Sequence, residues 1–151
     1  MRAVLLAAFL VPFAAAATTP VAPAPTSTPT PIRTPMQLEA HLHAAGYRNV
    51  FDVDLDDGLW EAKVRKAGGF WREVAVDPQN GRIFDGAGTR SVDALNAVSQ
   101  IVADKGYTMM ELAEQDGALW EVDAMDAQGR CLSLRVDAAS QSIVQSLPDD
   151  C

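Results

Sequence analysis

Side chains that could support catalysis are few in this sequence. Its two histidines, His41 and His43, lie in a segment whose residue pattern predicts a helix. Residues two positions apart on a helix point to different faces, so this pair cannot chelate one metal ion or act jointly as acid and base. We therefore expect solvated helix histidines and predict that the chain is not an enzyme.

An acidic run is the second candidate for chemistry: Asp52, Asp54, Asp56, Asp57 and Gly58. A calcium-binding loop that began at Asp52 would need glycine and glutamate where the chain has Asp57 and Lys63. The alternation in residues 51–56 instead predicts a strand whose aspartates pair across a hairpin with Lys63 and Arg65. We expect no metal and no cofactor; weak calcium binding by residues 52–57 is the alternative.

The first residues have the composition of a secretory signal peptide. Met1 and Arg2 supply a short positive region, residues 3–13 are apolar, and residues 14–17 are alanines that suit cleavage by signal peptidase. The apolar run is too short to cross a bilayer comfortably. We expect residues 1–17 to be removed and the mature protein to be periplasmic or secreted, with no stable membrane insertion.

A tether precedes the folded region. Residues 18–33 consist mainly of Pro, Thr and Ala, which leave little to bury, and this composition predicts an extended linker. Loss of Arg2 with the signal peptide would change the formal net charge from −8 to −9. An acidic surface repels nucleic acid and anionic lipid head groups, so a basic protein or peptide is the better partner.

The chain has two cysteines, Cys131 and Cys151. A pair of cysteines in an exported protein favours a disulfide. This disulfide would close a loop of about twenty residues and stabilise the fold by about 2–4 kcal/mol. Pairing between two chains through a mobile terminal thiol is the alternative. A catalytic cysteine would need a base nearby, and the sequence supplies none.

The sequence repeats itself after sixty residues, and no gap is needed to align the two copies. The coinciding positions include Gly46 with Gly106, Trp60 with Trp120, Val76 with Val136, Asp77 with Asp137, and Ile83 with Ile143. A register held over about fifty positions indicates a duplicated structural unit. We expect the first unit at residues 34–86 and the second at residues 87–151.

The patterns within the first unit predict one helix followed by three strands. Thr34 suits the cap of the helix, Pro35 its first turn, and Gly46 its end. Strands are expected in residues 51–55, 60–65 and 70–76, with the Asp57 and Gly58 turn between the first two. A further turn at residues 77–81 leads into an extended stretch at residues 82–84.

The second unit follows the same order. Ser91 is its expected helix cap, and strands are expected at residues 107–113, 119–125 and 130–136. The predicted fold is α+β, with two tandem units that each pack one helix on a three-stranded antiparallel β-meander. The helix would cover one face of each sheet and leave the other face wet.

The tryptophans fall into two groups. Trp60 and Trp120 share the parity of the inner sheet face, so we expect both in the core. Trp71 lies on the predicted outer face, and its counterpart in the second unit is Cys131. An exposed tryptophan on a charged sheet is typical of a contact residue. Packing of Trp71 under the linker or against the second unit is the alternative.

Residues 74–83, a strand that ends in Val76 and Asp77 and leads through a turn at Gly81 to Ile83, resemble the PepSY domain family. The second copy, residues 134–143, departs from this motif because it has no glycine. The resemblance implies a noncatalytic module that restrains peptidases or binds peptides, with a secreted metallopeptidase as one partner.

We expect partner contact on the outer face of the first sheet, through Trp71, Glu73, Asp52 and Asp54. The predicted function is that of an exported binding module that restrains a peptidase or binds a periplasmic protein or peptide. An envelope structural or sensory protein with no inhibitory role is the alternative.

Overall fold

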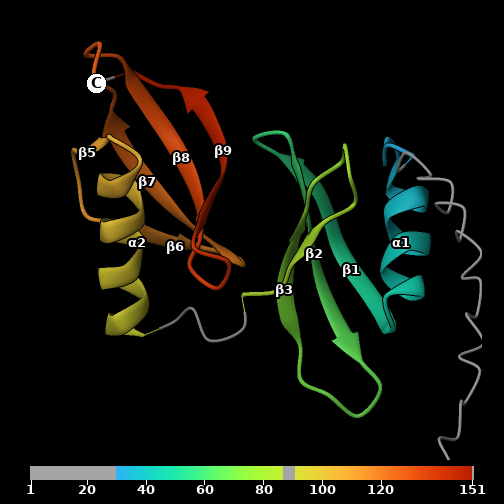
Figure 1. Cartoon of the computed structure of the whole chain (residues 1–151). Coiled ribbons are helices and arrows are strands. Elements are labelled where there is room, and N and C mark those ends of the chain that lie inside the picture. The colour runs from blue at the N-terminus through green and yellow to red at the C-terminus, as the bar shows by residue number, and fades with distance from the viewer. Residues whose placement is uncertain (1–29, 87–90, 151) are drawn as a thin grey trace, which may run out of the picture.

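The structure is a computed structural model that describes residues 30–86 and 91–150 (Figure 1). The expected signal peptide, most of the expected linker and Cys151 lie outside the described residues, so those predictions are not tested by it. The described chain contains two helices and two antiparallel sheets. It is therefore α+β, as predicted.

The first unit, residues 30–86, begins with helix α1 (Pro35–Ala44). The Thr34 side chain caps this helix by accepting a hydrogen bond from the Gln37 amide, and the Gln37 side chain accepts one from the Arg33 amide. The strands that follow are β1 (Tyr47–Asp56), β2 (Leu59–Lys66), β3 (Arg72–Val76) and β4 (Ile83–Phe84). They form one sheet in the order β1-β2-β3-β4, so the sheet has four strands where three were predicted.

The second unit, residues 91–150, begins with helix α2 (Val92–Asp104), which Ser91 caps. Its strands are β5 (Thr108–Met109), β6 (Glu114–Asp116), β7 (Leu119–Met125), β8 (Cys131–Asp137) and β9 (Ser142–Pro148). Strands β5 and β6 both pair with β7, and β8 and β9 follow in order. This sheet therefore has five strands, and the prediction of a three-stranded meander was wrong here too.

Of the strand predicted at residues 107–113, only Thr108–Met109 is a strand (β5), and β6 begins one residue after the predicted end. The intervening chain leaves the regular ladder, and the buried side chain of Ala113 packs in the core. The first unit accommodates a similar irregularity within β1, where the pairing register shifts between Phe51 and Asp54 and Asp52 has a φ of 48°. A bulge therefore keeps β1 continuous, whereas the second unit breaks the corresponding strand.

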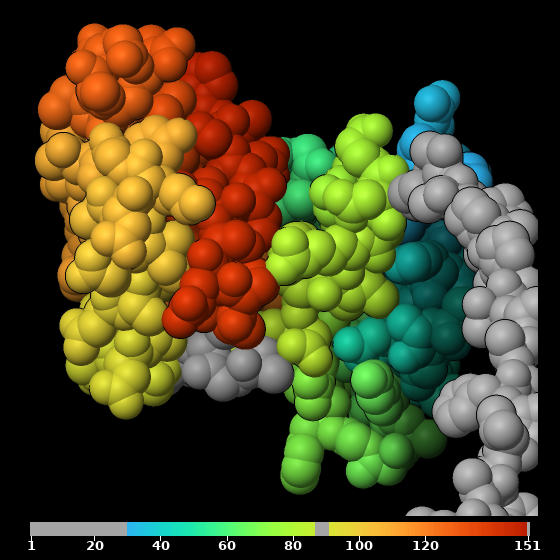
Figure 2. Space-filling view, viewed as in Figure 1, coloured from blue at the N-terminus to red at the C-terminus, as the bar shows by residue number. Residues whose placement is uncertain are grey.

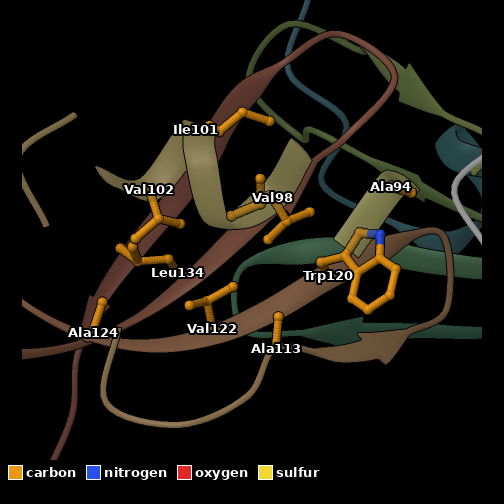
Figure 3. Close-up of a cluster of buried hydrophobic side chains, with 10 residues drawn as sticks. Ala94, Val98, Ile101, Val102, Ala113, Trp120, Val122, Ala124 and Leu134 are labelled. Carbon is orange, nitrogen blue, oxygen red and sulfur yellow. The ribbon is translucent and has the colours of Figure 1, made fainter. Parts of the chain in front are cut away.

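Each helix packs on one face of its own sheet. In the second unit, Val98 and Val102 of α2 lie over Val122 and Leu134, with Trp120 beside them (Figure 3). In the first unit, Leu38 and Leu42 of α1 belong to the equivalent apolar cluster, which also contains Trp60. Both tryptophans are therefore core residues, as predicted.

The core of the first unit also includes Ile32, which falls within the expected linker. Its side chain is buried, its amide donates a hydrogen bond to the Pro78 carbonyl at 2.7 Å, and its carbonyl accepts one from Trp60 Nε1 at 2.9 Å. A buried tryptophan needs a partner for its indole N–H. Ile32 meets that need, so the chain is anchored to the sheet before α1 begins.

The two sheets face each other, with α1 and α2 on the outer sides of the molecule (Figure 1). A third buried apolar cluster joins the units: Leu59, Ala75 and Phe84 from the first, and Ala118 and Leu119 from the second. The space-filling view shows the units in contact along this junction (Figure 2). The expectation that the sheet faces opposite the helices are wet was therefore wrong where the sheets meet, because these outer positions carry apolar residues.

Candidate functional site

An aromatic patch is exposed on the outer face of the first sheet. The rings of Phe51 and Trp71 lie 5.3 Å apart between centroids, and the Arg65 guanidinium lies 4.9 Å from the centroid of the Trp71 ring. Phe51 is 55% exposed and Trp71 is 49% exposed. Phe70, next to Trp71 in the chain, is 90% exposed. Exposed aromatic residues beside an arginine are characteristic of protein-binding surfaces.

The outer face of the first sheet changes character along strand β2. Near the aromatic patch, Arg65 donates hydrogen bonds to the Asn49 side chain. The next row across the sheet contains Phe51, Lys63 and Glu73, and the row after it Asp54, Glu61 and Ala75. The face therefore runs from an aromatic end to an acidic end that adjoins the second unit.

A cleft of about 430 Å³ opens between this acidic end and the turn that joins β6 to β7. We call it the inter-sheet cleft; it is lined by Asp52, Asp54, Glu61, Ala62, Lys63, Glu73, Val74, Asp116, Gly117 and Ala118. A Cβ atom placed on Gly117 would lie 3.9 Å from the Glu61 carboxylate and from Glu73 Cβ, which shows how closely the turn approaches the first sheet. Both units therefore contribute to the walls of the cleft.

Arg135 of β8 lies at the junction between the two units, and it is only 2% exposed. Its guanidinium contacts five carboxylates: Asp56 at 3.3 Å, Asp57 at 3.8 Å and Glu61 at 3.6 Å from the first unit, and Glu121 at 3.5 Å and Asp116 from the second. A buried cation requires such compensation because desolvation of a single charge costs several kcal/mol. No sequence pattern indicates this cluster beyond the presence of the charged residues themselves.

The charges at the junction affect one another's protonation. Burial alone would lower the pKa of Arg135, but the hydrogen bond and charge of Asp116, with Glu121 and Glu61, raise it above its usual value. The pKa of Glu61 is raised by its burial and by the charge of Asp116, which together outweigh the opposing effect of Arg135. The ionised form of Glu61 is therefore less favourable in the folded protein than in water.

The residues predicted to contact a partner lie on one surface. Trp71 belongs to the aromatic patch, and Asp52, Asp54 and Glu73 line the inter-sheet cleft beside it. Sequence reasoning missed Phe51 and Arg65 as neighbours of Trp71. It also missed the second unit's Asp116 and Gly117 as part of the same cleft. The alternation of Phe51 with the aspartates predicts an inward position with Val53, which is wrong, because the bulge at Asp52 shifts the register and leaves Phe51 on the outer face. The position of the β6–β7 turn depends on how the units meet.

Other side chains singled out in the sequence have separate surroundings. His41 Nε2 lies 2.7 Å from the Gly81 carbonyl oxygen, and His43 Nδ1 lies 2.8 Å from that of Tyr47, so the two imidazoles bond to different parts of the chain. Lys63 pairs with Asp52 at 3.1 Å across the β1–β2 hairpin, as predicted. Arg65 instead contacts Asn49 and Trp71, because it lies further along β2 from the aspartates.

The predicted disulfide is not tested by the structure, because Cys151 lies outside the described residues. Cys131 begins β8, and its carbonyl accepts a hydrogen bond from the Asp149 amide at 3.1 Å. The described chain thus comes back to Cys131 two residues before Cys151. This position is compatible with a bond between the two cysteines, which stays a prediction.

Comparison with known proteins identifies the family. The family described as peptidase propeptide and YPEB domain matches residues 3–87, more than half of the chain, and the chain therefore belongs to this family. The matched stretch ends one residue after the described part of the first unit, so the second unit lies outside it. No curated protein and no solved structure matches the chain. Within the described residues, neither helix has the length and apolar content needed to cross a membrane.

Proposed function

We propose that this member of the peptidase propeptide and YPEB domain family is an exported, noncatalytic binding module that restrains a secreted peptidase. Modules of this family typically act as propeptides or inhibitors of peptidases and carry no catalytic residues of their own. The partner is a protein, and the contact surface is the outer face of the first sheet. The single observation that carries the assignment of the surface is the exposed stack of Phe51, Trp71 and Arg65.

The composition of the face supports protein binding. A large aromatic ring that is half exposed contributes apolar area at a low cost in side-chain entropy, and such residues dominate the energetics of many interfaces. Glu73, Asp52 and Asp54 lie beside the ring and supply the polar surroundings that interfaces carry at their rims. We infer that these four residues contact the partner together.

We also propose that the second unit is a second copy of the first. Trp60 of β2 pairs with Val76 of β3, and Trp120 of β7 pairs with Val136 of β8, so the repeated residues occupy the same register in both sheets. In each unit the helix precedes the sheet and is capped by a hydroxyl side chain. The second copy supplies part of the cleft and need not bind a peptidase on its own.

Substitution of Trp71 tests the proposed surface. In a capture assay with a thermolysin-like metallopeptidase, Trp71→Ala should weaken binding by at least about tenfold, because an interface aromatic residue contributes about 2 kcal/mol or more. The matched control is Met36→Ala, which removes an exposed apolar side chain on α1, at the opposite face of the same sheet. Equal affinity of both variants, or a large loss of thermal stability in Trp71→Ala with binding intact, would exclude Trp71 as a contact residue.

A further inference from the structure

The inter-sheet cleft carries an excess of negative charge. Among its lining residues are five carboxylates and one ammonium group, that of Lys63, which pairs with Asp52. Arg135 partly neutralises the charges of Glu61 and Asp116. Its guanidinium is shared, however, with three further carboxylates: Asp56, Asp57 and Glu121. Among the residues that the structure describes, Lys63 and Arg135 thus contact more carboxylates than they can neutralise, and a further positive charge in the cleft would be favourable.

The cleft is continuous with the aromatic patch. The row of Glu61 and Asp54 lies two rows from Arg65 along β2, with the row of Phe51 and Lys63 between them. Residues four positions apart along a strand are separated by about 14 Å. In an extended peptide that lies along the outer face, two side chains four residues apart are thus separated by about the same distance as the cleft and the aromatic patch.

We propose that the inter-sheet cleft receives a lysine or arginine side chain of an extended partner segment, while an apolar side chain four residues away lies on the aromatic patch. The occupant is inferred from the charge of the cleft and from its continuity with the patch. The inference rests on the proposed function, because it assigns a recognition motif to the same binding face. It adds that the second unit, through Asp116 and the β6–β7 turn, forms part of that site.

A designed peptide provides the test without a peptidase. The acetylated and amidated nonapeptide Leu-Thr-Ser-Thr-Arg-Thr-Ser-Thr-Leu has a leucine four residues from its central arginine in either chain direction. Its control replaces the arginine with citrulline, which has nearly the same shape and no charge. We expect the purified protein to bind the arginine peptide about tenfold more tightly, with NMR shifts at the amides of Glu61 and Lys63, and we expect the preference to decline in high salt.

Two variants complete the experiment: a double substitution in the cleft and a control elsewhere. The double variant Asp54→Asn and Glu61→Gln should lose most of the preference for arginine, because both substitutions remove charge from the cleft and preserve shape. Glu111→Gln, which removes an exposed charge elsewhere on the second unit, should retain it. The proposal is overturned if the wild-type protein shows no preference, whether it binds both peptides or neither, or if the double variant keeps the preference. Because no peptidase is present, failure here is distinct from failure of Trp71→Ala to weaken peptidase binding.

Discussion

The guanidinium of Arg135 in the second sheet lies 3.3 Å from a carboxylate oxygen of Asp56 in the first. The two residues are 79 positions apart in the chain, and their ion pair belongs to the cluster of carboxylates around Arg135. The apolar cluster of Leu59, Phe84 and Leu119 lies at the same junction. Together these contacts hold the two units with their sheets face to face, and they thereby form the inter-sheet cleft.

Replacement of the buried arginine should destabilise the protein strongly. Arg135→Met removes the cation and leaves its carboxylates to repel one another, which we expect to lower the free energy of unfolding by about 3 kcal/mol, since removal of one partner of a buried ion pair typically costs 3–5 kcal/mol. The value lies at the lower end because several of the carboxylates are partly solvated. Urea denaturation measures the change.

The control for this substitution is Arg130→Met. Arg130 pairs with Asp126 at 2.6 Å, but its side chain is 73% exposed, so its loss should cost less than about 1 kcal/mol. If both variants lost equally little stability, the carboxylates around Arg135 would not depend on it, and the junction would have to be held by the apolar cluster alone.

The raised pKa of Glu61 predicts a pH-dependent stability. Because this pKa is higher in the folded protein than in the unfolded chain, the contribution of Glu61 to stability is fully present below the unfolded value and is lost as pH rises through the folded value. Glu61→Gln, which has no such titration, should therefore raise the melting temperature at neutral pH. The benefit should disappear below about pH 4, where the glutamate is protonated in both states. A variant that is less stable than the wild type at neutral pH would show that the contact with Arg135 outweighs the cost of burial.

Part of the structure could be predicted from local patterns alone. Thr34 and Ser91 are helix caps as expected, and the parity of Trp60 and Trp120 correctly places both in the cores. These features depend on neighbours within one unit, where spacing along the chain determines which side chains meet. The outward position of Trp71 follows from the same rule.

The junction could not be predicted in this way. In β8, Arg135 has the parity of Cys131 and Ser133, which is that of an outer and solvent-exposed face, yet the approach of the first unit buries it. Its partners, such as Asp56 and Asp57, are distant in sequence, and no local pattern connects them. Ile32 illustrates the same limit, because its burial depends on Pro78 and Trp60 and its own surroundings in sequence are typical of a linker.

The disulfide between Cys131 and Cys151 should form within one chain. We expect the mass of the purified native protein to indicate one disulfide per monomer, and Cys151→Ser to lower the free energy of unfolding by about 2–4 kcal/mol. The proximity of Asp149 to Cys131 supports this pairing. A dimer on a nonreducing gel that reverts to monomer on reduction would show that the cysteines pair between chains instead.

If the protein restrains a peptidase, it should inhibit that enzyme in solution. The purified protein should be titrated into the proteolytic activity that its own source secretes, with a thermolysin-like metallopeptidase alongside. We expect saturable inhibition near one protein per enzyme, and we expect Trp71→Ala to shift the titration to higher concentration. Full proteolytic activity at every concentration would show that the protein does not restrain these peptidases, and would favour a structural or sensory role in the envelope.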